Sequence, residues 1–406
     1  MQTKLISTIL ALQPLFPVFV YFSVLTGHPP LWLSLTIAVI PLGISYWYSR
    51  QIIRRTLFDM PILFFVGGTL VGFIVSPDKQ VGLGYFASAV ASILVYFGIT
   101  NNSGASKRYW FWTGGIMCLI TMVLSLWFFS QSVHRVLSFN QWAFNLFAGL
   151  PKTVGPVLNL HTIGALLAVM IPPLFVMVFL KNRISLRIII LTLFLFFSVV
   201  LFLSDSGTGW LAIIVSMTFI LVCWRKKLLW ILIPTEGVIT GAAVLFYDKL
   251  EWLRTTFSTS SFMDRVELWR NTITLLKGKA AITGLGSGSW LSVYNTHYSN
   301  TVAHVHNSYL QLYCDAGILG FIAMILAAVI FIRFSINLLK LHQQHPLYWI
   351  GIGLIGTVIS GAVFAIFDVT YSVTDVTKTG YIDLGLPLLW IGVALISVIN
   401  NKLLER

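Results

Sequence analysis

Long apolar segments recur along the whole chain and are separated by short polar stretches. A helix that crosses a bilayer needs about 20 largely apolar residues. Twelve segments approach or reach that length, near residues 5–26, 31–48, 60–75, 81–99, 110–130, 156–180, 188–203, 209–224, 228–246, 316–336, 347–367 and 383–399. The pattern predicts an all-α, polytopic membrane protein in which about twelve spans form a single domain over residues 1–406.

The distribution of basic residues predicts the orientation of these spans. One set of alternate loops and termini holds sixteen Lys and Arg residues, whereas the short loops of the other set hold four. Cytoplasmic loops carry an excess of Lys and Arg, so we predict that both termini are cytoplasmic. The long polar segment 247–305, between the ninth and tenth spans, is then an external loop.

Part of this loop has the spacing of an amphipathic helix. Over residues 262–277, apolar side chains recur every three or four positions and form one stripe, made of Phe262, Val266, Trp269, Ile273 and Leu276. Arg265 and Arg270 border the stripe, one on each side. We predict a helix that lies on the membrane domain with two arginines at the edge of its buried face.

Composition supports the membrane assignment and limits the function classes. Hydrophobic residues make up 57% of the chain and charged residues 10%, with a mean hydropathy of +0.87, whereas a soluble protein carries roughly 25% charged residues. A net charge of +13 would suggest nucleic acid for a soluble protein. Here most basic residues lie in short loops between apolar runs, so the charge reflects topology and no nucleic-acid partner is expected.

Cysteine usage and the N-terminus add two smaller expectations. Cys118, Cys223 and Cys314 are far apart and odd in number, and they form no disulfide framework or C-x-x-C metal pattern. The first apolar run lacks a small-residue cleavage pattern, so we expect an uncleaved first span rather than a signal peptide.

Two external arginines are candidates for binding an anion. The guanidinium groups of Arg265 and Arg270 match the geometry of phosphate oxygens. The alternative is that they pair with Asp264, Glu267 or lipid headgroups at the membrane interface, and the spacing alone does not decide between the two.

A histidine pair precedes the tenth span in the run His304-Val-His306-Asn307-Ser308. A histidine at the external mouth of a span can act as a general base near neutral pH. The pair could also bind zinc, although no further ligand cluster supports that. The structural alternative is a helix N-terminus that Asn307 or Ser308 caps, with His306 at the interface.

The tenth span itself begins in a run that is too long for one crossing. From Ser308 to Arg333 the chain is largely apolar, with Asp315 and Gly317 inside. We expect its first turns to project from the bilayer, and Gly317 and Gly320 to permit a bend or close helix packing.

The remaining polar features argue against a nucleotide site. Gly284-Leu-Gly-Ser-Gly288 follows no predicted strand and lacks the Lys-Ser/Thr of a phosphate-binding loop. No Asp-x-Asp is present, so a donor carried on a lipid fits an external site better than a metal-bound sugar nucleotide, and neither a metal nor another cofactor is expected. His161, Asp205 and Thr208 fall at external ends of spans and could line the same cavity.

In order and topology, these features resemble the O-antigen ligase and polymerase superfamily of bacterial envelope proteins. Five elements carry the resemblance over residues 155–335: Asn159-Leu-His161-Thr-Ile-Gly164 at the opening of a span, Ser206-Gly-Thr-Gly-Trp-Leu211, Arg265-Val-Glu-Leu-Trp269, the turn Gly284-Leu-Gly286, and His306-Asn307 followed by Gly317-Ile-Leu-Gly320. One departure is that the arginine common in the second element is Gly207 here. The charge would then come from Arg254, Arg270 or Lys152.

The resemblance implies a GT-C-like membrane glycosyltransferase that works without metal and with inversion. The donor would be a glycan on undecaprenyl pyrophosphate, and the acceptor lipid A–core or a growing glycan. Arg265 would stabilise the pyrophosphate leaving group and His306 would take the proton from the acceptor hydroxyl. Asn307 would contact the glycan, with His304 and His161 as further substrate-binding residues.

Several activities stay open at this point. A ligase, a polysaccharide polymerase and a protein O-oligosaccharyltransferase share the His-Asn region, and the modest loop favours the first two. A secondary transporter is the alternative from another class, because twelve spans with internal termini are also typical of transporters. The lack of a clear internal repeat, the few charges at the membrane midplane and the polar external loop favour the glycosyltransferase.

Overall fold

The computed structural model describes most of the predicted helices. It covers residues 12–17, 30–49, 53–102, 157–158, 160–180, 184–204, 206–232, 259–298, 304–345, 347–368, 381–382 and 385–404, with isolated positions at 20, 119, 121–123, 125–126, 234–235 and 237. Apart from two strands of two residues each, β1 (Val157–Leu158) and β2 (Tyr381–Ile382), the regular elements in this part of the chain are helices. The chain divides into two compact units, which are described separately.

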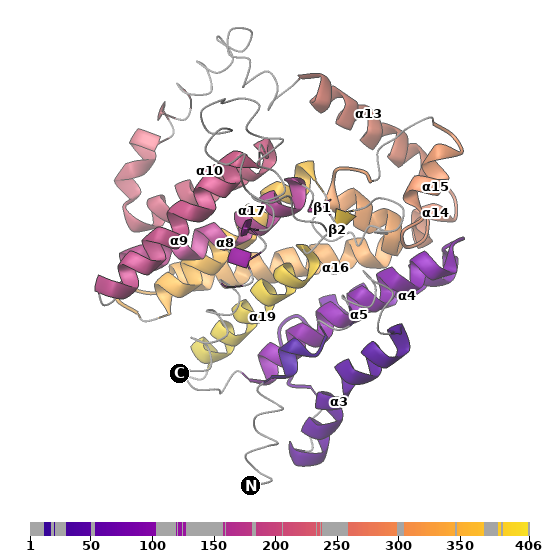
Figure 1. The fold of residues 1–406 in the computed structure, drawn as a ribbon, viewed down its shortest axis with the longest axis horizontal. Helices are drawn as coiled ribbons and strands as arrows, with labels where there is room; N and C mark the ends of the chain where they lie inside the picture. Colours follow the sequence, from indigo (N-terminus) through magenta and orange to yellow (C-terminus); the bar gives the residue numbers. More distant parts are fainter. Residues whose placement is uncertain are drawn as a thin grey trace, which may run out of the picture. The chain divides into compact units, whose positions relative to one another are not determined.

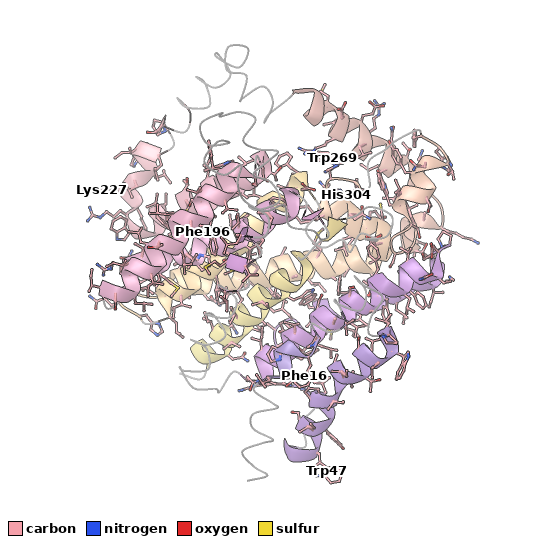
Figure 2. All side chains as sticks on the ribbon, viewed as in Figure 1. Phe16, Trp47, Phe196, Lys227, Trp269 and His304 are labelled. Atoms are coloured by element: carbon pink, nitrogen blue, oxygen red, sulfur yellow. The ribbon has the colours of Figure 1, made fainter. Side chains whose placement is uncertain are left out.

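The first unit contains residues Met1–Met117, Thr272–Lys340 and Val369–Arg406. Its described helices are η1 (Gln13–Leu15), α3 (Leu31–Ser49), α4 (Asp59–Val75), α5 (Lys79–Asn101), α14 (Ala280–Thr283), α15 (Trp290–Asn295), α16 (Ser308–Leu339) and α19 (Gly385–Leu404). The most extensive packing joins α4 to α16 and α5 to α19, and α4 and α5 also lie side by side (Figure 1). At the edge of this unit, Trp47 near the end of α3 is 83% exposed (Figure 2).

Glycines on α4 allow α16 to approach closely. A Cβ atom at Gly68 would lie 2.7 Å from the carbonyl oxygen of Ala316 and 2.8 Å from the amide nitrogen of Gly320. One turn further along, a Cβ atom at Gly72 would overlap the carbonyl oxygen of Asp315. Small residues let helix backbones pack tightly in apolar surroundings, so close packing at Gly320, expected from the sequence, is confirmed.

The second unit contains residues Cys118–Asn271 and Leu341–Asp368. Its described helices are α8 (Leu160–Phe179), α9 (Ile184–Leu203), α10 (Gly207–Trp224), η3 (Lys226–Leu228) and α17 (Tyr348–Phe367). Helix α17 packs on α8 and α10, and α8 packs on α9, which carries Phe196 (Figure 2). The hydroxyl of Thr357 donates a hydrogen bond of 3.1 Å to the carbonyl oxygen of Val169 and ties α17 to α8.

Nine of the twelve predicted spans coincide with described helices, namely α3, α4, α5, α8, α9, α10, α16, α17 and α19. Five of these, α5, α9, α10, α16 and α17, are long and apolar enough to cross a membrane by length and composition. The predicted spans near 5–26, 110–130 and 228–246 fall largely outside the described residues. The helical, multi-pass membrane character expected from the sequence is therefore supported, and the number of crossings stays a prediction.

Helix α16 is interrupted where the sequence suggested a bend. Gly317 has φ 61° and ψ −155° inside the run Ser308–Leu339, a conformation that is essentially restricted to glycine. At 1.5 Å per residue, the segment after the kink is about 33 Å long, close to the roughly 30 Å of a bilayer core. The segment after the kink is therefore long enough to cross the bilayer by itself, and the turns before Gly317 are not needed for the crossing.

Helix α13 (Thr259–Leu275) forms over most of the segment predicted to be an amphipathic helix, but the predicted apolar stripe is not its buried face. In the predicted stripe, Val266 is 40% exposed and Ile273 is 58% exposed, whereas Leu276 is buried. The side chains of Leu268 and Thr272 are buried instead. The apolar pattern pointed to the wrong face because the buried polar Thr272 accepts a hydrogen bond of 3.0 Å from the indole Nε1 of Trp290.

Candidate functional site

The His304–Asn307 turn leads directly into α16 and belongs to the first unit. Asn307 has an extended backbone and caps the helix, because its side-chain Oδ1 accepts a hydrogen bond of 2.9 Å from the amide of Leu310. This is the capping role that the sequence offered as an alternative.

His306 has an unusual backbone conformation. Its φ of 52° is the only positive φ of a non-glycine residue in the described part of the chain. Histidine enters this left-handed region more readily than most residues, and such conformations persist where the surroundings hold them and cluster at functional sites. The two rings of His304 and His306 lie edge to face, with centroids 4.3 Å apart, and His304 lies just before α16 (Figure 2).

A hydrogen bond within the turn links the two histidines. The amide of His306 donates to Nδ1 of His304 at 3.3 Å. An imidazole nitrogen that accepts a hydrogen bond carries no proton, so this contact uses the unprotonated Nδ1 of His304. The turn therefore holds two imidazole groups together.

The glycine-rich turn 284–288 packs against the kink of α16. A Cβ atom on Gly317 would overlap the carbonyl oxygen of Ile282, and one on Gly284 would overlap that of Cys314. The amide of Leu285 donates to the carbonyl oxygen of Cys314 at 2.7 Å. Glycine is needed at both positions because the two backbones touch, which is a packing role rather than a nucleotide-binding one.

The same turn is fixed to the end of α4. The amide of Ser287 donates to the carbonyl oxygen of Gly72 at 3.0 Å, and its hydroxyl donates to the carbonyl oxygen of Asp315 at 3.0 Å. The hydroxyl of Ser76 contacts the carbonyl oxygen of Ser287 at 3.1 Å and the hydroxyl of Ser289 at 2.8 Å. The turn is thus held from both sides by α4 and α16.

Two buried polar side chains on α16 connect the histidine turn with the glycine-rich turn. Gln311 is 2% exposed and Asp315 is 3% exposed. Oε1 of Gln311 accepts from the amide of Val305 at 3.3 Å, and Nε2 of Gln311 donates to Oδ2 of Asp315 at 3.0 Å. Oδ1 of Asp315 accepts from the amide of Gly288 at 3.0 Å. No role was predicted for these residues from the sequence; the available signal was a pair of polar residues four positions apart in an apolar helix.

The candidate arginines lie on α13, in the part that belongs to the second unit. Arg265 is three residues before the buried Leu268, on the same helix face, and is half-buried, whereas Arg270 is exposed. Within the described chain, the structure pairs neither arginine with Asp264 or Glu267. Intrahelical ion pairing, one alternative from the sequence, is therefore not what occupies these arginines. Their anion-binding role stays a proposal.

The last turn of α13 belongs to the first unit and is anchored there. Besides the bond between Trp290 and Thr272, the hydroxyls of Thr274 and Tyr298 are 2.9 Å apart. The rings of Trp290 and Tyr294 pack together with centroids 4.8 Å apart, and those of Tyr294 and Tyr298 with centroids 4.9 Å apart. These contacts hold the end of the helix that also carries Trp269 (Figure 2).

Most of the other site residues predicted from the sequence have side chains outside the described residues. His161 lies in the first turn of α8 and its side chain is outside the described residues, as are Lys152, Asp205 and Arg254. Thr208 lies in the first turn of α10, where Ser206 caps the helix and accepts from the amide of Gly209 at 3.2 Å. A Cβ atom on Gly164 would meet this serine, so Ser206 has a packing and capping role in the second unit.

The central region of the chain matches a known protein family. Residues 192–325 match the O-antigen ligase family model. The matched residues include four of the five elements that carried the resemblance, from Ser206 to Gly320, and the resemblance to the O-antigen ligase and polymerase superfamily is confirmed. No curated protein matches the chain.

The O-antigen ligase match includes both turns and the Gln311–Asp315 pair described above. It supports a membrane glycosyltransferase of the ligase or polymerase type. The chemistry available in the first unit is that of an imidazole pair held at the start of an apolar helix.

Proposed function

We propose that this protein is an O-antigen ligase-like glycosyltransferase that moves a glycan from undecaprenyl pyrophosphate to lipid A–core. The observation that carries the proposal is the His304–Asn307 turn, with its left-handed His306, inside the region that matches the O-antigen ligase family. The apolar helices around it suit a lipid-linked donor, because the prenyl chain can remain in the bilayer.

The proposed reaction is a single displacement. The acceptor hydroxyl attacks the anomeric carbon, the bond from that carbon to the phosphate oxygen breaks, and the pyrophosphate departs with the bonding electrons. His306 takes the hydroxyl proton, and Arg265 stabilises the charge that develops on the pyrophosphate. One displacement inverts the anomeric configuration, and no step requires a metal ion.

The remaining polar residues complete the proposed site. Arg270 is exposed and would contact the pyrophosphate together with Arg254 or Lys152, in place of the arginine that Gly207 replaces. Asn307 and His304 would contact the glycan or the acceptor, and His161 would be a further substrate-binding residue. The twelve-span topology, with cytoplasmic termini and the 247–305 loop in the periplasm of a bacterial inner membrane, is part of the proposal.

The test is glycan transfer in a bacterial host that lacks its own ligase. Wild type should place polymer on lipid A–core, and His306→Asn and Arg265→Ala should each abolish it at matched membrane levels. Two controls on external residues should transfer normally: His297→Asn, since His297 is exposed, and Met263→Ala, since Met263 is 65% exposed on α13.

The possible failures have different meanings. Normal transfer by both site variants would overturn the site assignment. Longer glycan chains that stay on undecaprenyl pyrophosphate would show a polymerase, and glycan on protein would show a protein O-oligosaccharyltransferase. Counterflow of a labelled solute in proteoliposomes, without any glycan transfer, would show a transporter.

A further inference from the structure

A buried chain of hydrogen bonds runs from the histidine turn to the glycine-rich turn. It begins at the amide of Val305, passes through the side chains of Gln311 and Asp315, and ends at the amide of Gly288. We propose that Gln311 and Asp315 are positioning residues that fix the His304–His306 turn, an inference that rests on the proposed role of His306. Neither side chain is assigned a contact with substrate.

The order of donors and acceptors in this hydrogen-bond chain requires a carboxylate at one position. Both ends are backbone amides, which can only donate. The carboxamide of Gln311 accepts with one atom and donates with the other, so Asp315 must accept on both oxygens, as an ionised carboxylate does. An asparagine at position 315 would leave two donors facing each other in every orientation of the two amides.

One end of this hydrogen-bond chain is the amide of Val305, the residue between the two histidines. Val305 is fully buried, and its amide is held by Gln311 on the first turns of α16. This fixes the backbone that places His306 at φ 52° and directs the His306 amide to Nδ1 of His304. A left-handed residue needs such support, because its unsupported backbone would relax.

The other end of the hydrogen-bond chain, at Gly288, is held by contacts with three helices. Gly288 follows Ser287, whose amide and hydroxyl bond the carbonyl oxygens of Gly72 on α4 and of Asp315 itself. A Cβ atom on Gly288 would lie 2.8 Å from the ring of Tyr85 on α5. The hydrogen-bond chain therefore ties the histidine turn to α4, α5 and α16, and α4 packs on both of the other two helices in the first unit.

The position of the carboxylate distinguishes this proposal from simple core packing. Asp315→Asn and Gln311→Glu each keep the size of the side chain but break the donor–acceptor order. The double variant Gln311→Glu/Asp315→Asn restores it. The new carboxylate at position 311 accepts from the amide of Val305 and from the new carboxamide at position 315, which in turn accepts from the amide of Gly288. Buried polar networks of this kind are apportioned only by such double-variant comparisons.

The experiment measures transfer by the purified full-length protein in proteoliposomes. Each single variant should lower kcat by about 10- to 100-fold with a smaller change in KM, because the turn is displaced while the arginines proposed to bind the pyrophosphate stay in place. The double variant should return to within about threefold of wild type. Tyr313→Phe is the matched control: it removes a hydroxyl that donates to the carbonyl oxygen of Ala281 at 2.7 Å on the same helix, and it should leave kcat unchanged.

A second readout does not depend on activity. Acylation of histidines by diethyl pyrocarbonate, followed by peptide mass spectrometry, should be about tenfold faster at His304 and His306 in the single variants, as expected for the loss of one buried hydrogen bond. Labelling should return to the wild-type rate in the double variant. If wild type shows no transfer but this labelling pattern holds, the proposed function fails and the positioning role stands.

Two results would overturn the inference. One is wild-type kcat and labelling in both single variants, while His306→Asn is inactive. The other is a double variant as impaired as the worse single variant, which would show that charge or packing at each position matters rather than the order of the hydrogen bonds.

Discussion

At the scale of single residues, the left-handed backbone of His306 limits which substitutions can test its role. Its left-handed conformation is accessible to histidine, asparagine and glycine at lower cost than to other residues. A substitution that changes both the imidazole and the backbone preference would confuse chemistry with folding.

His306→Asn is therefore expected to separate the two effects. Because general-base catalysis contributes about 10²- to 10⁴-fold, transfer should fall by at least about 100-fold. The free energy of unfolding should change by less than about 1 kcal/mol, since asparagine adopts the same backbone region. His306→Ala should be equally inactive but less stable. A stable, fully active His306→Asn protein would exclude His306 as the base.

Part of the candidate site could be recognised from the sequence. His306 and Asn307 stand out because polar residues precede a long apolar run, and the capping role of Asn307 is a local property of a helix start. Gln311 and Asp315 could not be assigned because their partners, the amides of Val305 and Gly288, come from two separate turns. Only the folded chain shows that both amides point at the same pair of side chains.

At the scale of elements, the long apolar helices were predictable and their details were not. Uninterrupted apolar runs define helices such as α9 and α17 whatever surrounds them. In α13 the apolar stripe failed as a guide, because Thr272 occupies the buried face and is satisfied by Trp290. Hydrophobic periodicity cannot anticipate a buried polar residue whose partner lies on another element.

The kink of α16 leads to a prediction on stability. Gly317→Ala should lower the free energy of unfolding by about 3 kcal/mol or more, because its backbone is in a glycine-only region and a Cβ atom would meet the carbonyl oxygen of Ile282. Gly43→Ala in α3 is the control, since nothing lies within 4 Å of its added Cβ atom. Thermal unfolding in detergent measures both. Equal midpoints for the two variants would contradict the kink.

The anchoring of α13 gives a second element-scale prediction. Trp290→Phe removes the donor to the buried hydroxyl of Thr272 and should cost about 1–3 kcal/mol. The loss should appear as faster amide hydrogen exchange over residues 268–276, with little change in α9. Ser292→Ala, which removes a hydroxyl that bonds within its own segment, should leave that exchange unchanged. Unchanged exchange in Trp290→Phe would mean that other contacts hold this end of α13.

At the scale of the whole molecule, the orientation in the membrane is predicted from basic residues rather than from any contact. One set of alternate loops and termini carries sixteen Lys and Arg residues and the short loops of the other set carry four, which predicts that segment 247–305 lies outside the cytoplasm. The family match supports the ligase or polymerase class. According to the proposed function, the protein uses its lipid-linked glycan on the side of the membrane opposite the cytoplasm.

Cysteine labelling tests this orientation. In a variant without the three native cysteines, Met263→Cys on α13 should react with a membrane-impermeant maleimide in intact spheroplasts. Lys227→Cys, in the basic loop after α10 (Figure 2), should react only after the membrane is permeabilised. Both original side chains are exposed, so access is not limited by folding. The opposite pattern would invert the topology and remove the site from the periplasm.

The measurement that tests the central claim most directly is transfer in proteoliposomes that hold only the purified protein, undecaprenyl-pyrophosphate-linked glycan and lipid A–core. With wild type and no added metal, glycan should appear on lipid A–core with inverted anomeric configuration, and His306→Asn should form none above background. Transfer by His306→Asn at the wild-type rate would contradict the mechanism, and no transfer by wild type to this acceptor would contradict the ligase assignment itself.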